Sequence, residues 1–127
     1  MITVYRIEHK KTKRKNGIGF GCYIVREIEI KGDWHNRMSN DHNNNETHPG
    51  MRDDLPNFYN INDDRDFYCA FKSIDDLKRW FRGYLTDIKK NGFVIKKYLV
   101  SEITESYSGL QTFFNVNHVI ASEIYIK

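Results

Sequence analysis

The sequence predicts an α+β fold with a mainly antiparallel sheet of about five to six strands. Three observations lead to this prediction. Short segments rich in β-branched and aromatic residues recur along the chain, one stretch at residues 74–90 has helical spacing, and a long segment at residues 33–66 has almost no apolar periodicity. A chain of 127 residues fits one hydrophobic core and is too short for two, so we expect a single domain over residues 1–127.

The expected strands begin at the amino terminus. Residues 2–8 and 20–30 both alternate and are rich in β-branched and aromatic side chains, so we expect them to pair around the basic turn between them. The short apolar run at residues 67–71 predicts a buried strand. Three more strands are expected at residues 93–100, 109–116 and 119–126, separated by turn-forming polar residues and glycine.

One helix is expected over residues 74–90 and is expected to pack on the sheet. Ser73 is a favourable N-cap residue, two aspartates follow in the first turn, and Lys89-Lys90-Asn91-Gly92 is a typical helix end. The aromatic stripe of this helix indicates core packing. Its apolar positions are Leu77, Trp80, Phe81, Tyr84, Leu85 and Ile88.

Residues 33–66, called the flap below, are the expected location of a functional site. The flap contains both prolines, three of the five histidines, and eight acidic residues against three arginines. A long irregular segment recovers its backbone entropy only through specific contacts, so such a segment indicates either function or disorder. Because the whole chain has a net charge of +3, the prediction is an irregular acidic flap on a basic body.

Several functional classes are not expected. No apolar run approaches the roughly 20 residues of a membrane helix, and the amino terminus lacks the order of a signal peptide, so we expect a cytoplasmic protein with no membrane partner. Cys22 and Cys69 have no CxxC spacing and are expected to be buried thiols. His35, His42 and His48 match no compact zinc pattern, so neither a metal nor a cofactor is expected.

Four parts of the chain resemble a set of small phage and bacterial proteins. These are the opening Val4-Tyr5-Arg6-Ile7-Glu8-His9, the His48-Pro49 pair followed by Asp53-Asp54, residues 67–81, and the strand after Gly92. Those relatives carry Gly-x-Gly-Pro-Tyr where this chain has Gly19-Phe20-Gly21-Cys22-Tyr23, which leaves the shape of the basic turn open. In size and layout the chain also resembles Thoeris anti-defence proteins, which sequester cyclic ADP-ribose-type signals in oligomeric pockets.

This resemblance implies a phage-type anti-defence protein in an infected or lysogenic bacterial host cell. It implies a homo-oligomer that sequesters an NAD-derived or cyclic nucleotide signal without cleaving it. A looser resemblance to ADP-ribosyltransferases rests on the order of Arg6, Ser73 and Gln111. That mechanism needs a carboxylate where Gln111 is neutral, so we expect no enzyme. An ADP-ribosyltransferase-like enzyme stays an alternative.

A nucleotide site needs cations for phosphate, aromatic faces for the base and a cover that excludes water. Glycine backbone beside the basic residues 10–15 favours phosphate binding at that turn. In the flap, Trp34 and Phe58 are further aromatic candidates for stacking on a base. The residues expected to bind the ligand are Arg6, His9, Lys11, Arg14, His48, Arg52, Asp54 and Tyr59.

A protein-binding inhibitor of the anti-CRISPR or anti-restriction type is the competing hypothesis. In that case the carboxylates of the flap, Asp53-Asp54 and Asp63-Asp64 among them, would imitate nucleic-acid phosphate and occupy a basic cleft on a host enzyme. The short basic turn is weak evidence for binding duplex DNA, and the acidic flap would repel a duplex backbone. Duplex DNA is therefore not an expected partner.

Overall fold

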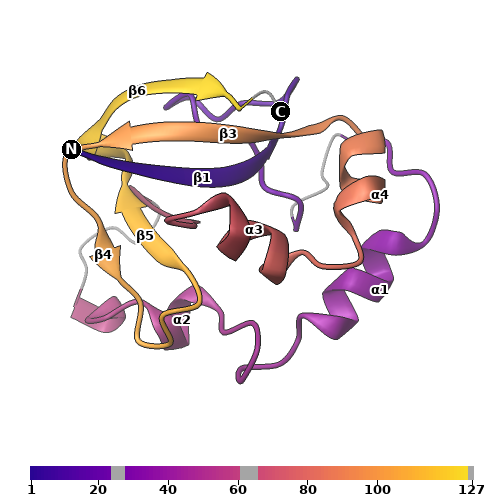
Figure 1. The fold of residues 1–127 in the computed structure, drawn as a ribbon, viewed down its shortest axis with the longest axis horizontal. Helices are drawn as coiled ribbons and strands as arrows, with labels where there is room; N and C mark the ends of the chain where they lie inside the picture. Colours follow the sequence, from indigo (N-terminus) through magenta and orange to yellow (C-terminus); the bar gives the residue numbers. More distant parts are fainter. Residues whose placement is uncertain (24–27, 61–65, 126–127) are drawn as a thin grey trace.

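A computed structural model describes residues 1–23, 28–60 and 66–125, and it confirms the α+β class (Figure 1). Within these residues six strands form two antiparallel sheets, each of three strands. The first sheet has the order β1-β3-β6 and the second has the order β2-β5-β4. The bounds are Ile2–His9 for β1, Phe67–Ala70 for β2, Phe93–Val100 for β3, Thr104–Glu105 for β4, Thr112–Asn115 for β5 and Val119–Ile124 for β6.

Among the residues that the structure describes, one backbone bridge joins the two sheets, so the strands expected in one antiparallel sheet are divided between two. Tyr5 and Phe71 exchange two backbone hydrogen bonds of 2.8 Å. After Phe71 the chain leaves for a helix, so pairing between β1 and the β2 segment stops there. By contrast, β1 pairs with β3 along its whole length, from Ile2 opposite Val100 to His9 opposite Phe93.

The expected pairing of residues 2–8 with residues 20–30 is wrong for the described part of that stretch. Only a small hairpin forms: Lys13 bridges to Gly19, and the His9 N–H donates to the Phe20 carbonyl at 2.8 Å. β3 occupies one edge of β1, and Phe71 takes the backbone groups of Tyr5 on the other. A second strand paired along the whole edge of β1 would displace this Phe71 contact. Residues 24–27 lie outside the described ranges.

The single helix expected over residues 74–90 is two short helices, α3 (Ile74–Trp80) and α4 (Leu85–Lys90). Gly83 lies between them with a φ of +90°, a left-handed conformation that no right-handed helix continues through. The N-cap prediction is confirmed, because the Ser73 hydroxyl accepts a hydrogen bond from the Asp76 N–H at 3.0 Å. The apolar face is also confirmed, since Leu77 and Ile88 are buried.

The flap is partly helical, which corrects the expectation of an irregular segment. It contains α1 (Trp34–Asp41), the one-turn helix α2 (Met51–Asp54) and a 3₁₀ turn at Phe58–Asn60. Trp34 and Met38, one helical turn apart, are buried in the core. Two apolar anchors were enough to fix α1 although the overall pattern is polar. Asp63 and Asp64 lie outside the described residues.

The first sheet carries a core on each of its faces. Ile7, Phe93 and Ile95 point towards the helices, where they pack with Trp34 and other apolar side chains. Residues on the opposite face, including Val4, Tyr98 and Val100, pack against Phe114 and the second sheet. Strand alternation produces this division. No helix in the described part of the chain is long and apolar enough to span a membrane.

Candidate functional site

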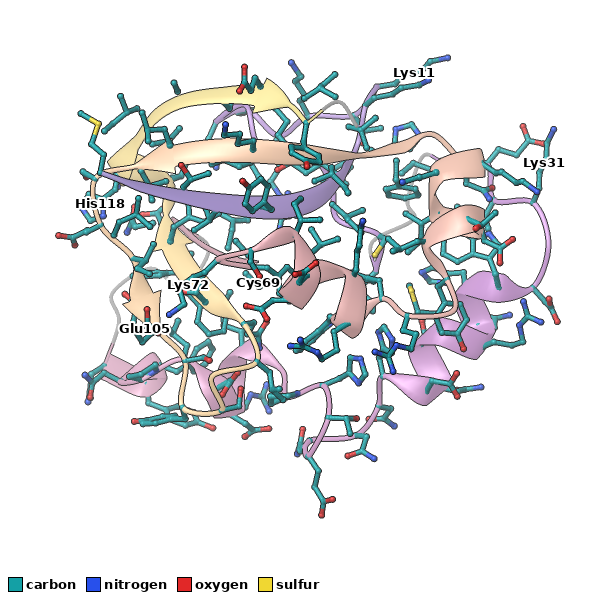
Figure 2. All side chains as sticks on the ribbon, in the orientation of Figure 1. Lys11, Lys31, Cys69, Lys72, Glu105 and His118 are labelled. Carbon is teal, nitrogen blue, oxygen red and sulfur yellow. The ribbon has the colours of Figure 1, made fainter. Side chains whose placement is uncertain are left out.

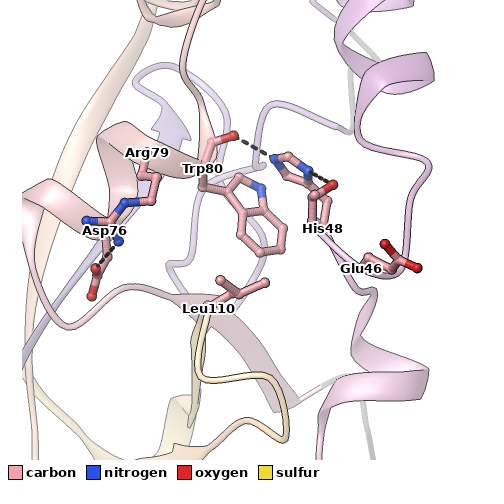
Figure 3. Close-up of a pocket in the computed structure, with 7 residues that line it drawn as sticks. Glu46, His48, Asp76, Arg79, Trp80 and Leu110 are labelled. Carbon is pink, nitrogen blue, oxygen red and sulfur yellow. Dashed lines mark hydrogen bonds and ion pairs between the residues drawn. The ribbon is translucent and has the colours of Figure 1, made fainter.

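The best candidate site is a cleft between the loop that joins α1 to α2, the end of α3, and the loop before β5 (Figure 1). It contains two pockets, of about 440 Å³ and about 310 Å³, and both are lined by His48 and Trp80. The smaller pocket is drawn in Figure 3, where Trp80 lies between His48 and Leu110. We call this region the aromatic cleft. Its ring-bearing residues are Tyr23, His42, His48 and Trp80.

The two histidines of the aromatic cleft stack face to face. The rings of His42 and His48 have centroids 3.7 Å apart and an interplanar angle of 11°. Trp80 meets His48 edge to face at 4.6 Å. His48 Nε2 donates to the Trp80 carbonyl at 2.8 Å, and its Nδ1 lies 2.9 Å from the Thr47 hydroxyl. Because a carbonyl only accepts, the Nε2 atom of His48 carries a hydrogen.

A hydrogen-bond chain links the indole to the second histidine. The Trp80 Nε1–H donates to the Tyr23 hydroxyl oxygen at 2.8 Å, and that hydroxyl contacts Nδ1 of His42. The Tyr23 hydrogen is then free to be donated to His42, which accepts as a neutral ring. Burial, and secondly the adjacent His48 ring, lower the pKa of His42 to about 4. The cleft therefore presents a neutral imidazole at physiological pH.

The flap is fastened to the loop before β5 by a buried carboxylate. Asp54 accepts hydrogen bonds from the Ser108 N–H at 2.8 Å, the Ser108 hydroxyl at 2.8 Å and the Gln111 amide at 2.9 Å. The same Gln111 nitrogen also donates to the Pro49 carbonyl at 2.7 Å. These contacts hold the segment after His48 against the second sheet. They place one wall of the aromatic cleft.

The rim of the smaller pocket is polar. Arg79 and Asp76 form an ion pair of 3.0 Å there, with Glu46 on the opposite side (Figure 3). Cys69 lines the larger pocket, and it is a free, partly buried thiol. The combination offers aromatic faces, a neutral imidazole and one exposed guanidinium. A planar heterocycle with polar substituents fits this chemistry.

Two of the expected cationic ligands have their side chains turned inwards. Arg6 is buried, and its guanidinium donates to Glu8 at 3.0 Å, to the Cys69 carbonyl at 3.1 Å and to the Gly19 carbonyl at 3.4 Å. Arg14 donates to the same Gly19 carbonyl at 2.9 Å and lies over the ring of Tyr68. Both side chains stabilise the turn at Gly19. Their expected role in ligand binding stays a prediction.

The remaining expected residues are spread over the surface. His48 is part of the aromatic cleft, whereas His9 packs on Phe93 and accepts a hydrogen bond from the Lys11 N–H at 3.2 Å. Lys11 lies at the edge of the molecule away from the cleft (Figure 2). Arg52 and Tyr59 are exposed on the flap. The structure therefore divides the residues expected to bind the ligand among several regions. The Asp54 carboxylate already accepts hydrogen bonds from Ser108 and Gln111.

The two other aromatic candidates lie in different parts of the structure, and so do the residues on which the resemblance to ADP-ribosyltransferases rests. Trp34 is 2% exposed and belongs to the core, while Phe58 packs edge to face on Tyr59. Ser73 caps α3 and Gln111 binds Asp54, and within the described residues neither is hydrogen-bonded to Arg6.

Sequence reasoning missed Tyr23, His42 and Trp80 as parts of one site. Helical spacing predicts Trp80 in a core stripe; in the structure it ends α3, packs against the core and is only partly buried, so that it also lines the cleft. The seven-residue segment from His42 to His48 in a polar flap was the only local signal, and nothing near Tyr23 indicates its partners. No group of three or more metal-ligating side chains is positioned to hold a metal within the described ranges.

A comparison with protein-family models finds a match. The family model described as Bacteriophage T4 Y00F protein matches residues 1–125. No curated protein sequence and no solved structure matches the chain.

Proposed function

The chain belongs to the Bacteriophage T4 Y00F protein family, and from this premise we propose that it is a phage anti-defence protein that binds a nucleotide signal in the aromatic cleft. The ligand class is an NAD-derived or cyclic nucleotide, for example a cyclic ADP-ribose-type molecule. The protein sequesters this ligand and does not cleave it. The family match supports the phage origin of the protein. The anti-defence role is proposed from the resemblance to Thoeris anti-defence proteins, and the nucleotide ligand is proposed from the chemistry of the aromatic cleft.

The observation that carries the proposal is the stacked His42–His48 pair against Trp80, with two pockets that both share His48 and Trp80 in their lining. A nucleobase entering the larger pocket meets aromatic faces, and stacking on such faces contributes roughly 1–3 kcal/mol per base. The second pocket leaves room for the sugar. Arg79 lines this pocket, is 62% exposed at the side chain, and offers a cation for a phosphate in competition with its ion-pair partner Asp76.

The polar groups of the cleft favour a neutral heterocycle over a cation. His42 stays neutral because of its lowered pKa, and its Nδ1 is occupied by Tyr23. Within the described residues no hydrogen-bond partner reaches Nε2 of His42, so this atom is available to a ligand edge. A nucleobase, which carries both donors and acceptors on its edges, is matched by one imidazole N–H and the Asn43 amide that lines the same pocket.

The direct test is to purify the protein from cells that make nucleotide signals, denature it, and identify released compounds by mass spectrometry. We expect a nucleotide to be released, and we expect the same compound to raise the melting temperature of emptied protein, since a ligand at about 100 times its Kd stabilises by roughly 2.7 kcal/mol. Release of nothing, together with no thermal shift from NAD, ADP-ribose or cyclic nucleotides, would contradict the proposal.

A variant pair locates the binding. His48→Ala removes one wall of the cleft, and we expect it to weaken binding roughly 5- to 100-fold, the equivalent of one lost stacking contact. His118→Ala is the matched control, because His118 is a surface residue far from the cleft (Figure 2) and should leave affinity unchanged. Equal affinity in both variants would place the ligand elsewhere. Bound nucleotide recovered intact after long incubation supports sequestration, and recovered fragments would instead indicate an enzyme.

A homo-oligomer whose pocket is shared between copies stays a prediction. Light scattering with and without the ligand tests it. A monomer that binds the nucleotide with full affinity would contradict the shared pocket and would leave the proposed cleft intact.

A further inference from the structure

A further pocket, separate from the aromatic cleft, lies where the basic turn meets the first sheet, at the edge of the molecule near Lys11 (Figure 2). It has a volume of about 80 Å³, which makes it much smaller than either pocket of the aromatic cleft. Three lysines line it: Lys10, Lys13 and Lys96. Val94 and Ile124 form an apolar wall. We call it the lysine pocket.

Three separate segments bring these lysines together. Lys10 follows β1, and its N–H donates to the Gly92 carbonyl at 3.0 Å. Lys13 is held by its bridge to Gly19, and Lys96 lies within β3. The backbone beneath all three ammonium groups is therefore fixed by hydrogen bonds. A cluster of like charges on a fixed backbone repels itself unless an anion binds.

Among the residues described, none of these three lysines forms an ion pair with a carboxylate, whereas Lys72 pairs with Glu105 at 2.9 Å and Lys97 pairs with Glu123 at 3.6 Å. The lysine pocket is thus a concentration of positive charge that the described part of the protein does not neutralise. That surplus is available to an external anion.

Glu8 also lines the lysine pocket, but its charge is already compensated. One carboxylate oxygen accepts from the Gly19 N–H at 3.0 Å. The other accepts from the Tyr98 hydroxyl at 2.6 Å and from Arg6 at 3.0 Å. The Arg6 guanidinium offsets the carboxylate, so the three lysine charges remain in excess.

We propose that the lysine pocket binds a phosphate group. The three lysines supply the charge, and charge-assisted hydrogen bonds from ammonium groups to phosphate oxygens are stronger than neutral ones. The phosphate could belong to a small phosphorylated molecule or to a nucleic-acid backbone, since both present the same group. This proposal does not depend on the aromatic cleft.

Adjacent lysines of β3 provide a matched test. Lys96 and Lys97 lie next to each other on one strand and point to opposite faces of the sheet, so Lys96→Gln and Lys97→Gln remove the same charge from neighbouring positions. The probes are inorganic phosphate and ADP, measured by calorimetry, and a labelled 12-nucleotide single-stranded DNA, measured by fluorescence anisotropy at several salt concentrations. Far-UV circular dichroism checks that each variant is folded.

We expect Lys96→Gln to weaken binding of the best probe about fivefold or more, Lys96→Arg to retain it, and Lys97→Gln to change it less than twofold. Binding of the oligonucleotide with a steep salt dependence identifies a nucleic-acid backbone as the source, since the slope reflects the number of phosphates contacted. Binding of phosphate or ADP alone identifies a small molecule. Equal losses in Lys96→Gln and Lys97→Gln, or no binding of any probe, would overturn the proposal.

A final measurement separates the two sites. Trp80→Phe should leave phosphate-group binding at the lysine pocket unchanged, because Trp80 lines the aromatic cleft and does not line the lysine pocket. Loss of binding at the lysine pocket in Trp80→Phe would overturn the assignment of a separate phosphate site. Failure of nucleotide binding at the aromatic cleft would not contradict a phosphate site at the lysine pocket.

Discussion

The protonation state of His42 depends on the residues that surround its ring. Its ring is stacked on His48, accepts from Tyr23, and lies near Asp41, whose charge opposes part of the lowering of its pKa. Burial and the second imidazole have the larger effect, so protonation of His42 is disfavoured in the folded state. The same contacts that prepare the cleft for a heterocycle make it sensitive to acid.

We predict that His42 makes stability rise with pH between about 4 and 6.5. The folded-state pKa is lowered to about 4 from a usual value of 6.5, so the unfolded chain binds more protons in this range. The stabilisation is complete above pH 6.5 and is lost as the pH falls towards 4. Urea denaturation at several pH values should show a flatter profile for His42→Phe than for the wild type. Parallel profiles would contradict this.

Arg6 illustrates a cation whose role the sequence did not reveal. It lies with Glu8 inside the protein, both less than 10% exposed. Removing one member of such a pair leaves an uncompensated buried charge, which costs about 3–5 kcal/mol. Loss of nucleotide binding in Arg6→Ala would therefore report on folding, and it is a poor test of ligand contact. Charge in the sequence does not distinguish a ligand-binding arginine from a buried one.

At the scale of elements, the flap depends on one carboxylate. Asp53 and Asp54 are adjacent, yet Asp53 is exposed and Asp54 is buried with three donors. α2 turns one aspartate inwards and its neighbour outwards. The flap is thereby fixed by specific polar contacts, as a long segment of low periodicity requires.

We predict that Asp54→Ala lowers the free energy of unfolding by about 2–3 kcal/mol, because three donors lose a charged acceptor. Asp53→Ala is the control and should stay within about 0.5 kcal/mol of the wild type. Chemical denaturation measures both. Similar small effects in the two variants would show that the Asp54 contacts do not anchor the flap.

The division of the expected helix is also decided within an element. The apolar spacing from Leu77 to Ile88 continues through the break, so periodicity alone predicts one helix. Gly83 has a left-handed backbone, and an added Cβ there would meet no atom within 4 Å. The left-handed backbone conformation therefore explains the glycine at this position. Crowding by neighbouring atoms does not explain it.

At the scale of the whole molecule, the two core clusters share the first sheet. Both tryptophans lie on the helical side: Trp34 belongs to the cluster with Phe93, and Trp80 packs against it. Phe114 belongs to the other cluster, with Val4 and Tyr98. Tryptophan fluorescence therefore reports on one half of the molecule, whereas circular dichroism reports on both.

We predict that the described structure unfolds as one cooperative unit. Phe114→Leu should lower the free energy of unfolding by about 1–2 kcal/mol, which is less than the roughly 3–5 kcal/mol expected when a buried phenylalanine is replaced by alanine. The transition seen by tryptophan fluorescence should shift as much as the transition seen by circular dichroism, although the substitution lies in the other cluster. A fluorescence transition that stays in place would show two independently unfolding halves.

Much of the fold was predictable, because its signals are local. The strand at 93–100, the Ser73 cap and the α+β class all follow from residue spacing within one segment. The candidate site was predictable only as a region, the flap, and as one residue, His48. The pairing of β1 with β3, the split into two sheets and the burial of Arg6 depend on partners far away in sequence, for which no local pattern exists.

By itself, then, the sequence determined the strands β1 and β3, the helical segment after Ser73 and where charge gathers, since propensity and periodicity act over a few residues. Only the tertiary structure decided which side chains meet. Tyr23, His42 and Trp80 come from three distant segments and form one cleft, while Lys10 from the turn after β1 and Lys96 from β3 line one pocket. Such sites arise from long-range packing, in which each contact depends on the whole chain being folded.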